Sequence, residues 1–143
     1  MTQPARPLRI LFVCIGNMCR SPMAEAFARV LGGEAVEAYS AGTHATGVVS
    51  ADSILTMEEL GIDITAQTSK SLDEIDTGDM DVVVSMARVP ARRLVPAGFR
   101  GRVVDWNVAD PVGAGLDQFR RVRDDIERRV RVLLAELGVV VIA

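Results

Sequence analysis

Apolar residues along this chain fall into short runs of strand length that alternate with longer segments of helical spacing. The run over residues 8–13 is continuous and aliphatic, which is typical of a strand buried on both faces. Residues 80–86 and 102–106 carry similar runs, and residues 35–40 alternate between apolar and other positions. The pattern therefore predicts four strands.

Apolar positions repeat at helical spacing in three longer segments between and after these strands. The segments are residues 21–31, 50–60 and 116–137. Pro22 suits the first turn of a helix because its missing N–H needs no partner there. Gly32-Gly33 and Gly61 are stop signals for the first two segments. Ser71 and Glu74 have the spacing of a capping box over one further, short helix.

Strands that alternate with helices predict an α/β fold. We expect residues 1–143 to form a single domain, a three-layer sandwich whose four-stranded parallel sheet is flanked by helices on both faces. Ligands of such sheets bind beyond the carboxyl ends of the strands. The loop after the first strand, residues 14–20, is placed there.

Composition narrows the class of protein. Hydrophobic residues make up 49% of the chain and aromatic residues only 4%, so aliphatic packing must dominate the core. The net charge of -3, without a basic stretch, predicts no nucleic acid partner, and the arginines of residues 120–131 alternate with acidic residues as on a solvated helix face. No apolar run is long enough for a signal peptide or a membrane span, so we expect a cytoplasmic protein without a membrane partner.

Both cysteines of the chain, Cys14 and Cys19, lie in the loop CIGNMCR over residues 14–20. Cys19 directly precedes Arg20. A metal site, a disulfide and a nucleophile that faces an anion are the three possible explanations. Gly16 and Asn17 tolerate left-handed backbone, so the loop can curl its N–H groups inward as a nest for an oxyanion. The N-terminus of the following helix and the planar fork of Arg20 would both favour a phosphate-like group.

A cysteine in such a field ionises readily, which makes Cys14 a candidate nucleophile for in-line attack and a cysteinyl-phosphate intermediate. A small cysteine after a buried strand can also be plain core, but the strand, the loop composition and the helix together favour function. Zinc is excluded by the C-x4-C spacing and by the single histidine, His44, in a distant turn. We expect no metal and no cofactor, and we expect His44 to be a surface-turn or loop-bracing residue rather than a catalyst.

The stretch VCIGNMCRSPMAEA resembles the phosphate-binding loop of the low-molecular-weight protein tyrosine phosphatase family. The resemblance continues through YSAGT, LGIDIT and DVVVSM to DPVGAGLDQFRRVRDDI, and so covers most of the chain. It implies a four-stranded parallel sheet, a phosphate-binding loop after the first strand, and metal-free hydrolysis of phosphate monoesters, with protein phosphotyrosine as the foremost substrate. The expected partner is a phosphoprotein or an inorganic oxyanion, and the expected state is a monomer.

By position, the resemblance makes Cys14 the nucleophile, Arg20 the transition-state clamp, and Asp110, followed by Pro111, the general acid. It places Asn17, Ser21 and Ser40 in the polar network that holds the loop. The residues expected to bind substrate are those of the loop: Ile15, Gly16, Asn17, Met18, Cys19 and Ser21.

Cys19 resembles the family's neighbouring cysteine, which can capture an oxidised nucleophile as a disulfide, so the resemblance implies redox sensitivity. Cys19 can equally be a small packing residue of the loop. Both explanations stay open from the sequence.

Two departures from the family pattern concern the substrate. The sequence Val112-Gly113 follows the Asp-Pro pair where phosphotyrosine enzymes usually carry aromatic residues, and in this it is similar to the branch of protein arginine phosphatases. That branch has threonine in the loop where this chain has Met18, whose apolar side chain suits an aromatic wall better. A protein arginine phosphatase is therefore one alternative.

The related thioredoxin-coupled arsenate reductases share the scaffold and the character of the C-terminal half, but they use further cysteines near the third strand. This chain has Ser85, Met86 and Val89 there, so an arsenate reductase would need Cys19 or an external thiol. The sequence alone thus favours a phosphatase over a reductase. A non-catalytic phosphate-binding module is the remaining alternative.

Overall fold

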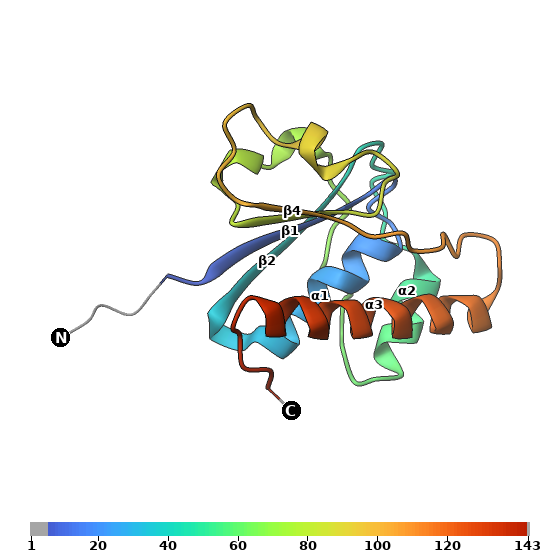
Figure 1. The fold of residues 1–143 in the computed structure, drawn as a ribbon. Coiled ribbons are helices and arrows are strands. Elements are labelled where there is room, and N and C mark those ends of the chain that lie inside the picture. Colours follow the sequence, from blue (N-terminus) through green and yellow to red (C-terminus); the bar gives the residue numbers. More distant parts are fainter. Residues whose placement is uncertain (1–5, 143) are drawn as a thin grey trace.

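A computed structural model of the chain describes residues 6–142. Four parallel strands form one sheet in the order β2-β1-β3-β4 (Figure 1). The strands are β1 (Leu8–Cys14), β2 (Val36–Gly42), β3 (Val82–Ser85) and β4 (Arg102–Asp105). The α-helices are α1 (Arg20–Gly32), α2 (Ala51–Glu58) and α3 (Leu116–Glu136). The predicted α/β fold with a four-stranded parallel sheet is confirmed.

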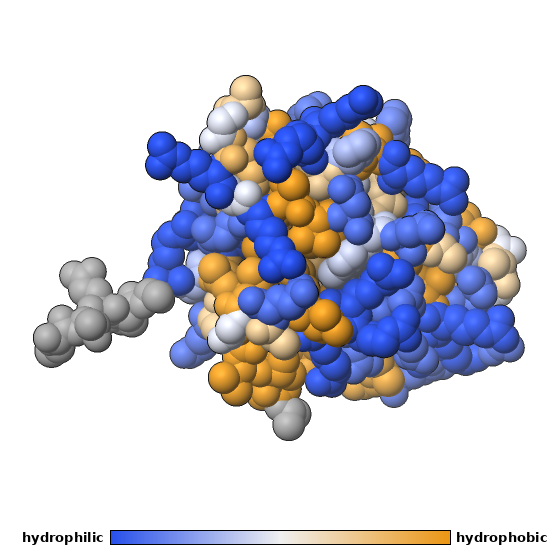
Figure 2. All heavy atoms as spheres, in the orientation of Figure 1, coloured by the Kyte–Doolittle hydropathy of each residue, from blue (hydrophilic) through white to orange (hydrophobic). Residues whose placement is uncertain are grey.

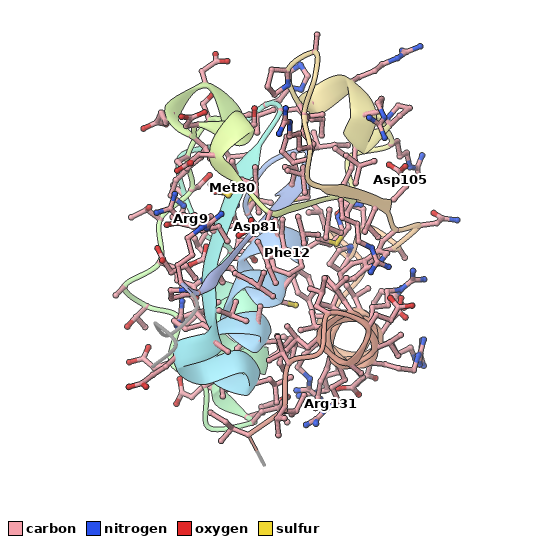
Figure 3. The ribbon with its side chains drawn as sticks, turned by 60° about the vertical axis from the view of Figure 1, so that its left-hand side comes forward. Arg9, Phe12, Met80, Asp81, Asp105 and Arg131 are labelled. Carbon is pink, nitrogen blue, oxygen red and sulfur yellow. The ribbon has the colours of Figure 1, made fainter. Side chains whose placement is uncertain are left out.

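Strand β1 is central because its side chains are buried on both faces of the sheet. Ile10, Phe12 and Cys14 pack into the larger apolar cluster with the three α-helices, which all lie on one side of the sheet (Figure 1). Figure 3 shows Phe12 in the interior between the sheet and these helices. Leu11 and Val13 point to the opposite face and join a second, smaller cluster. The continuous aliphatic run of the sequence thus serves two cores.

The opposite face is covered by short 3-10 helices and loops. These 3-10 helices are Leu72–Glu74, Thr77–Asp79 and Ala91–Leu94. Leu72, Ile75 and Phe99 pack from these segments against the smaller cluster. The sheet is therefore flanked on both faces as predicted, but its two outer layers differ in kind, since all α-helices lie on one of them.

Helix boundaries follow the predicted signals with small shifts. The N-cap of α2 is Ser50, whose hydroxyl accepts a hydrogen bond from the N–H of Asp52. The predicted end of α2 at residue 60 is two residues too late, because the chain turns into Gly61, which has a φ of 77°. The capping box of Ser71 and Glu74 is present, but the helix that it starts is a single 3-10 turn.

Figure 2 shows one face of the molecule, whose surface is mostly hydrophilic. Apolar side chains gather near the C-terminal segment, where Val140 and Ile142 are exposed. Arg131 lies on the solvent side of α3 (Figure 3) and pairs with Glu127 at 2.9 Å, as expected for a solvated helix face. Within residues 6–142, no helix combines the length and the apolarity that a membrane crossing requires.

Candidate active site

The loop between β1 and α1 is held open by hydrogen bonds from the segment that follows β2. Four of its carbonyl groups, those of residues 14, 15, 16 and 18, accept from backbone N–H groups of Thr43, His44, Thr46 and Ser50 at 2.7–3.1 Å. Because N–H and C=O point in opposite directions in a planar peptide group, the N–H groups of the same four peptides, those of residues 15, 16, 17 and 19, point away from that segment. This arrangement suits an oxyanion.

Asn17 fixes the shape of this loop. It is fully buried and has a φ of 46°, the left-handed conformation that the sequence suggested. Its side-chain oxygen accepts from the N–H of Lys70 at 2.8 Å, and its amide nitrogen donates to Ser21 Oγ at 2.7 Å. Gly16 does not share the left-handed conformation. Its missing side chain instead leaves room for Thr46, whose methyl group would lie 3.3 Å from a Cβ there.

Cys14 lies at the end of β1 with its sulfur 2.9 Å from Ser21 Oγ, and only 2% of the residue is exposed. The amide of Asn17 occupies a lone pair of Ser21, which leaves the hydroxyl proton of Ser21 free to point at sulfur. Ser21 can therefore stabilise a thiolate at Cys14.

Arg20 lies behind the same pocket. Its Nη1 donates to the carbonyl groups of Met86 and Val108 at 3.1 Å each, and these carbonyls follow the ends of β3 and β4. Its Nη2 lies 3.8 Å from Asp110, whose side chain is half exposed and accepts from the N–H of Val112 at 3.0 Å. The guanidinium of Arg20 and the carboxylate of Asp110 thus lie at the same pocket although they are far apart in the sequence.

The pocket between these groups has a volume of about 180 Å³. It is lined by residues of the loop and by residues from two other segments: Cys14, Ile15, Gly16, Met18, Cys19, Arg20, His44, Thr46, Asp110 and Val112. A larger hollow of about 350 Å³ lies beyond the ends of β3 and β4, around Arg88 and Trp106, but no thiol lines it. The small pocket is the candidate active site.

Cys19 lines the same pocket as Cys14 and is 4% exposed. Burial raises the pKa of the Cys19 thiol, while the neighbouring hydroxyl groups of Ser53 and Ser50 act in the opposite direction. Both cysteines are free thiols. Among residues 6–142, no group of three or more His, Cys, Asp or Glu side chains is arranged to hold a metal ion.

Ser40 lies outside the pocket. Its hydroxyl donates to Glu25 of α1, and its carbonyl accepts from Lys70 Nζ at 3.1 Å, so it reaches Asn17 only through Lys70. Neither Lys70 nor Thr46 was predicted from the sequence. His44 was expected to be a surface-turn or loop-bracing residue, and its N–H donates to the carbonyl of Ile15.

Comparison with known proteins assigns this architecture to a known group. Residues 9–140 match the family described as low molecular weight phosphotyrosine protein phosphatase. The glutaredoxin arsenate reductase of Synechocystis sp. is 37% identical over 134 residues, which cover 91% of this chain and 98% of that protein.

Two solved structures are similar throughout. One, described as an arsenate reductase in the phosphate binding state, has 37% identity and a TM-score of 0.80, and covers 90% of this chain and 98% of its own. The low molecular weight protein tyrosine phosphatase of T. tengcongensis has 31% identity and a TM-score of 0.78, and covers 90% and 99%.

Proposed function

We propose a reaction on the premise that this chain belongs to the low molecular weight phosphotyrosine protein phosphatase family, a family of enzymes, as the match over residues 9–140 establishes. The proposed reaction is the reduction of arsenate to arsenite by thiols. Its main support is the pocket in which the Cys14 thiol, the Arg20 guanidinium and the Asp110 carboxylate converge on a space suited to one tetrahedral oxyanion.

In the first step, the Cys14 thiolate attacks arsenic(V) and forms a sulfur–arsenic bond. One arsenic–oxygen bond breaks, and Asp110 donates a proton so that this oxygen leaves as water. The inner N–H groups of the loop and Arg20 stabilise the charge on the remaining oxygens.

In the second step, another thiolate attacks the sulfur of Cys14. A disulfide forms, the sulfur–arsenic bond breaks, and its electron pair stays on arsenic, which leaves as arsenite in the arsenic(III) state. An external thiol or dithiol then reduces the disulfide. The attacking thiol is Cys19 or an external thiol, because the chain contains no third cysteine.

The similarity to arsenate reductases is what moves the proposal away from the phosphatase that the sequence favoured. The 37% identity extends over nearly the full length of the Synechocystis enzyme. The absence of cysteines near β3 changes which thiol can attack Cys14 in the second step. It leaves the oxyanion site itself unchanged, because Ser85 and Met86 lie outside the pocket lining.

Quantifying arsenite by mass spectrometry, with arsenate and either a monothiol or a dithiol reductant, tests this proposal. We expect arsenite from the wild type well above the reaction without enzyme, and none from Cys14→Ser. Cys19→Ser should lose the activity if Cys19 is the second thiol, and keep it with a monothiol if an external thiol attacks. Background levels of arsenite from the wild type with both reductants would refute arsenate reduction.

Hydrolysis of aryl phosphates is the second candidate. It is favoured by the apolar mouth of the pocket, where Ile15 and Val112 are exposed and Met18 is partly buried. Turnover of p-nitrophenyl phosphate and a phosphotyrosine peptide without arsenite formation would make the protein a phosphatase, and turnover of a phosphoarginine peptide alone would select that branch.

A further inference from the structure

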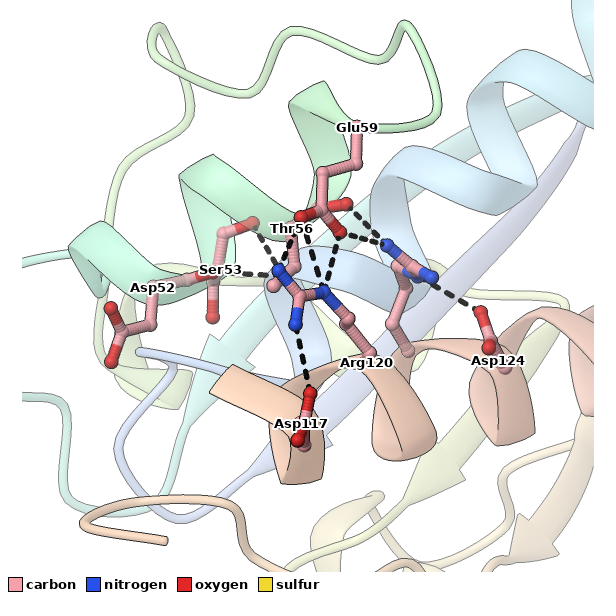
Figure 4. A network of polar contacts seen from close by, with 8 residues as sticks. Asp52, Ser53, Thr56, Glu59, Asp117, Arg120 and Asp124 are labelled. Carbon is pink, nitrogen blue, oxygen red and sulfur yellow. Dashed lines mark hydrogen bonds and ion pairs between the residues drawn. The ribbon is translucent and has the colours of Figure 1, made fainter. Parts of the chain in front are cut away.

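The second helix lies against the loop that carries both cysteines. At its start, the N–H of Ser50 donates to the carbonyl of Met18 at 2.9 Å. At its end, Arg123 of α3 donates to the carbonyl of Thr56 and to Glu59, both at 2.8 Å (Figure 4). Helix α2 is thus attached to the cysteine loop at its start and to α3 at its end.

Further contacts reinforce the second of these anchors. Arg120 lies beside Glu59 at 2.8 Å and, together with Arg123, holds the pKa of Glu59 below its usual value (Figure 4). Glu59 therefore stays ionised, and the polar network keeps the buried face of α2 in one position.

Ser53 lies on that buried face. It is fully buried, and its hydroxyl oxygen is one of two buried side-chain nitrogen or oxygen atoms without a hydrogen-bond partner among the described residues. An unsatisfied buried hydroxyl is unfavourable for folding. Burial raises the pKa of the Cys19 thiol, the hydroxyl groups of Ser53 and Ser50 lower it, and the negative charges of Cys14 and Asp110 raise it further. A thiol is a weak acceptor, whereas a thiolate is a charged one, so a hydrogen bond from this hydroxyl is stronger when Cys19 is ionised.

We propose that Ser53 is a positioning residue that stabilises the thiolate of Cys19 for attack on the sulfur of Cys14. This inference rests on the proposed function in one respect, because it names Cys19 as the second thiol of that reaction. The same attack occurs after peroxide treatment. Peroxide oxidises the Cys14 thiolate to a sulfenic acid and is itself reduced to water; the Cys19 thiolate then forms the disulfide and releases hydroxide.

The effect of removing the hydroxyl depends on pH in a characteristic way. In Ser53→Ala the Cys19 thiolate loses a charge-assisted hydrogen bond, which reduces the ionised fraction at neutral pH about tenfold. A less stabilised thiolate is also more nucleophilic, by roughly threefold for such a change. The variant should therefore form the disulfide roughly threefold more slowly near pH 7. This difference should shrink only as the pH approaches the pKa of the Cys19 thiol, which burial raises.

The melting temperature separates an effect on Cys19 from a general loss of stability. Alanine removes an unsatisfied group and favours helix, so Ser53→Ala should keep or raise the melting temperature. Thr56→Val is a matched control, because Thr56 is equally buried on α2 but its hydroxyl already donates to the carbonyls of Asp52 and Ser53. That variant should follow the wild-type pH profile.

In the assay, the Cys19 thiolate and added dimedone compete for the sulfenic acid of Cys14. Protein treated with peroxide and a fixed concentration of dimedone gives either the Cys14–Cys19 disulfide or the dimedone adduct, and mass spectrometry measures their ratio from pH 6 to 10. Comparison of each variant with the wild type at the same pH cancels the pH dependence of dimedone.

A wild type that forms roughly threefold more disulfide per dimedone adduct than Ser53→Ala near pH 7, with Thr56→Val unchanged, supports the proposal. Coincident profiles of Ser53→Ala and wild type overturn it, as does a wild type that forms no Cys14–Cys19 disulfide. The outcome does not depend on arsenic: a wild type without arsenite formation but with this difference between the two proteins refutes the proposed function and leaves the role of Ser53 standing.

Discussion

Asn17→Ala is the change that probes the loop most directly. The substitution removes the hydrogen bonds to Ser21 and to the N–H of Lys70, and it leaves alanine with a φ of 46°. The lost bonds and the donor left without a partner cost about 2–4 kcal/mol, and the left-handed backbone costs alanine about 1 kcal/mol more. We expect a total loss of roughly 3–5 kcal/mol, which lowers the melting temperature by roughly 10–17 °C.

Asn17→Gly is the matched control, since glycine lacks the same hydrogen bonds but accepts the left-handed backbone. It should be more stable than Asn17→Ala by about 1 kcal/mol in urea unfolding. Both variants should lose at least tenfold in turnover at a temperature where they are folded, because the proton of Ser21 is no longer directed to Cys14. A loss below about 1 kcal/mol for Asn17→Ala, or wild-type turnover in either variant, would refute this account of the loop.

Three further predictions concern other parts of the site. Cys14→Ser should bind inorganic phosphate about as tightly as the wild type in calorimetry, because the loop and Arg20 remain; a large loss of affinity would mean that the thiol holds the anion. Asp110→Asn should lose a factor of roughly 10²–10⁴ on arsenate or phosphotyrosine, and much less on an activated aryl phosphate. Wild-type rates of Asp110→Asn on all of these substrates would leave Asp110 a turn residue. Gly42→Ala should weaken phosphate binding at least about tenfold, since a Cβ would lie 2.7 Å from the carbonyl oxygen of Ile15 and 2.9 Å from the nitrogen of Asn17. Unchanged affinity would show that the loop adjusts freely.

The sequence predicted those parts of the fold that depend on local pattern. The strands and the three α-helices were predicted correctly because burial of one or both faces gives apolar residues a characteristic spacing along the sequence. Strand β2 extends two residues beyond its prediction, to Gly42, because pairing of Cys14 with Gly42 continues the ladder, and such pairing has no local signal.

The candidate site was predicted where its residues are contiguous, in the loop. Lys70 could not be found, since its backbone N–H meets the side chain of Asn17, which is distant in sequence. His44 and Thr46 had a usable signal, because the segment after β2 leaves the sheet at the same carboxyl edge as the loop. Ser40 was expected near the loop, but its hydroxyl turns to Glu25.

The hydrogen bonds that the segment after β2 makes to the loop have a consequence for selectivity. With four loop carbonyls already engaged, the anion-binding groups are ordered before any anion arrives, so binding needs little rearrangement. Under the proposed reaction, such a rigid cradle should accept phosphate and arsenate alike, because the two ions share charge and tetrahedral shape. Phosphate should therefore compete with arsenate for the empty enzyme. Discrimination between the two ions must arise after binding, at the step in which the central atom accepts an electron pair, which arsenic(V) does far more readily than phosphorus(V).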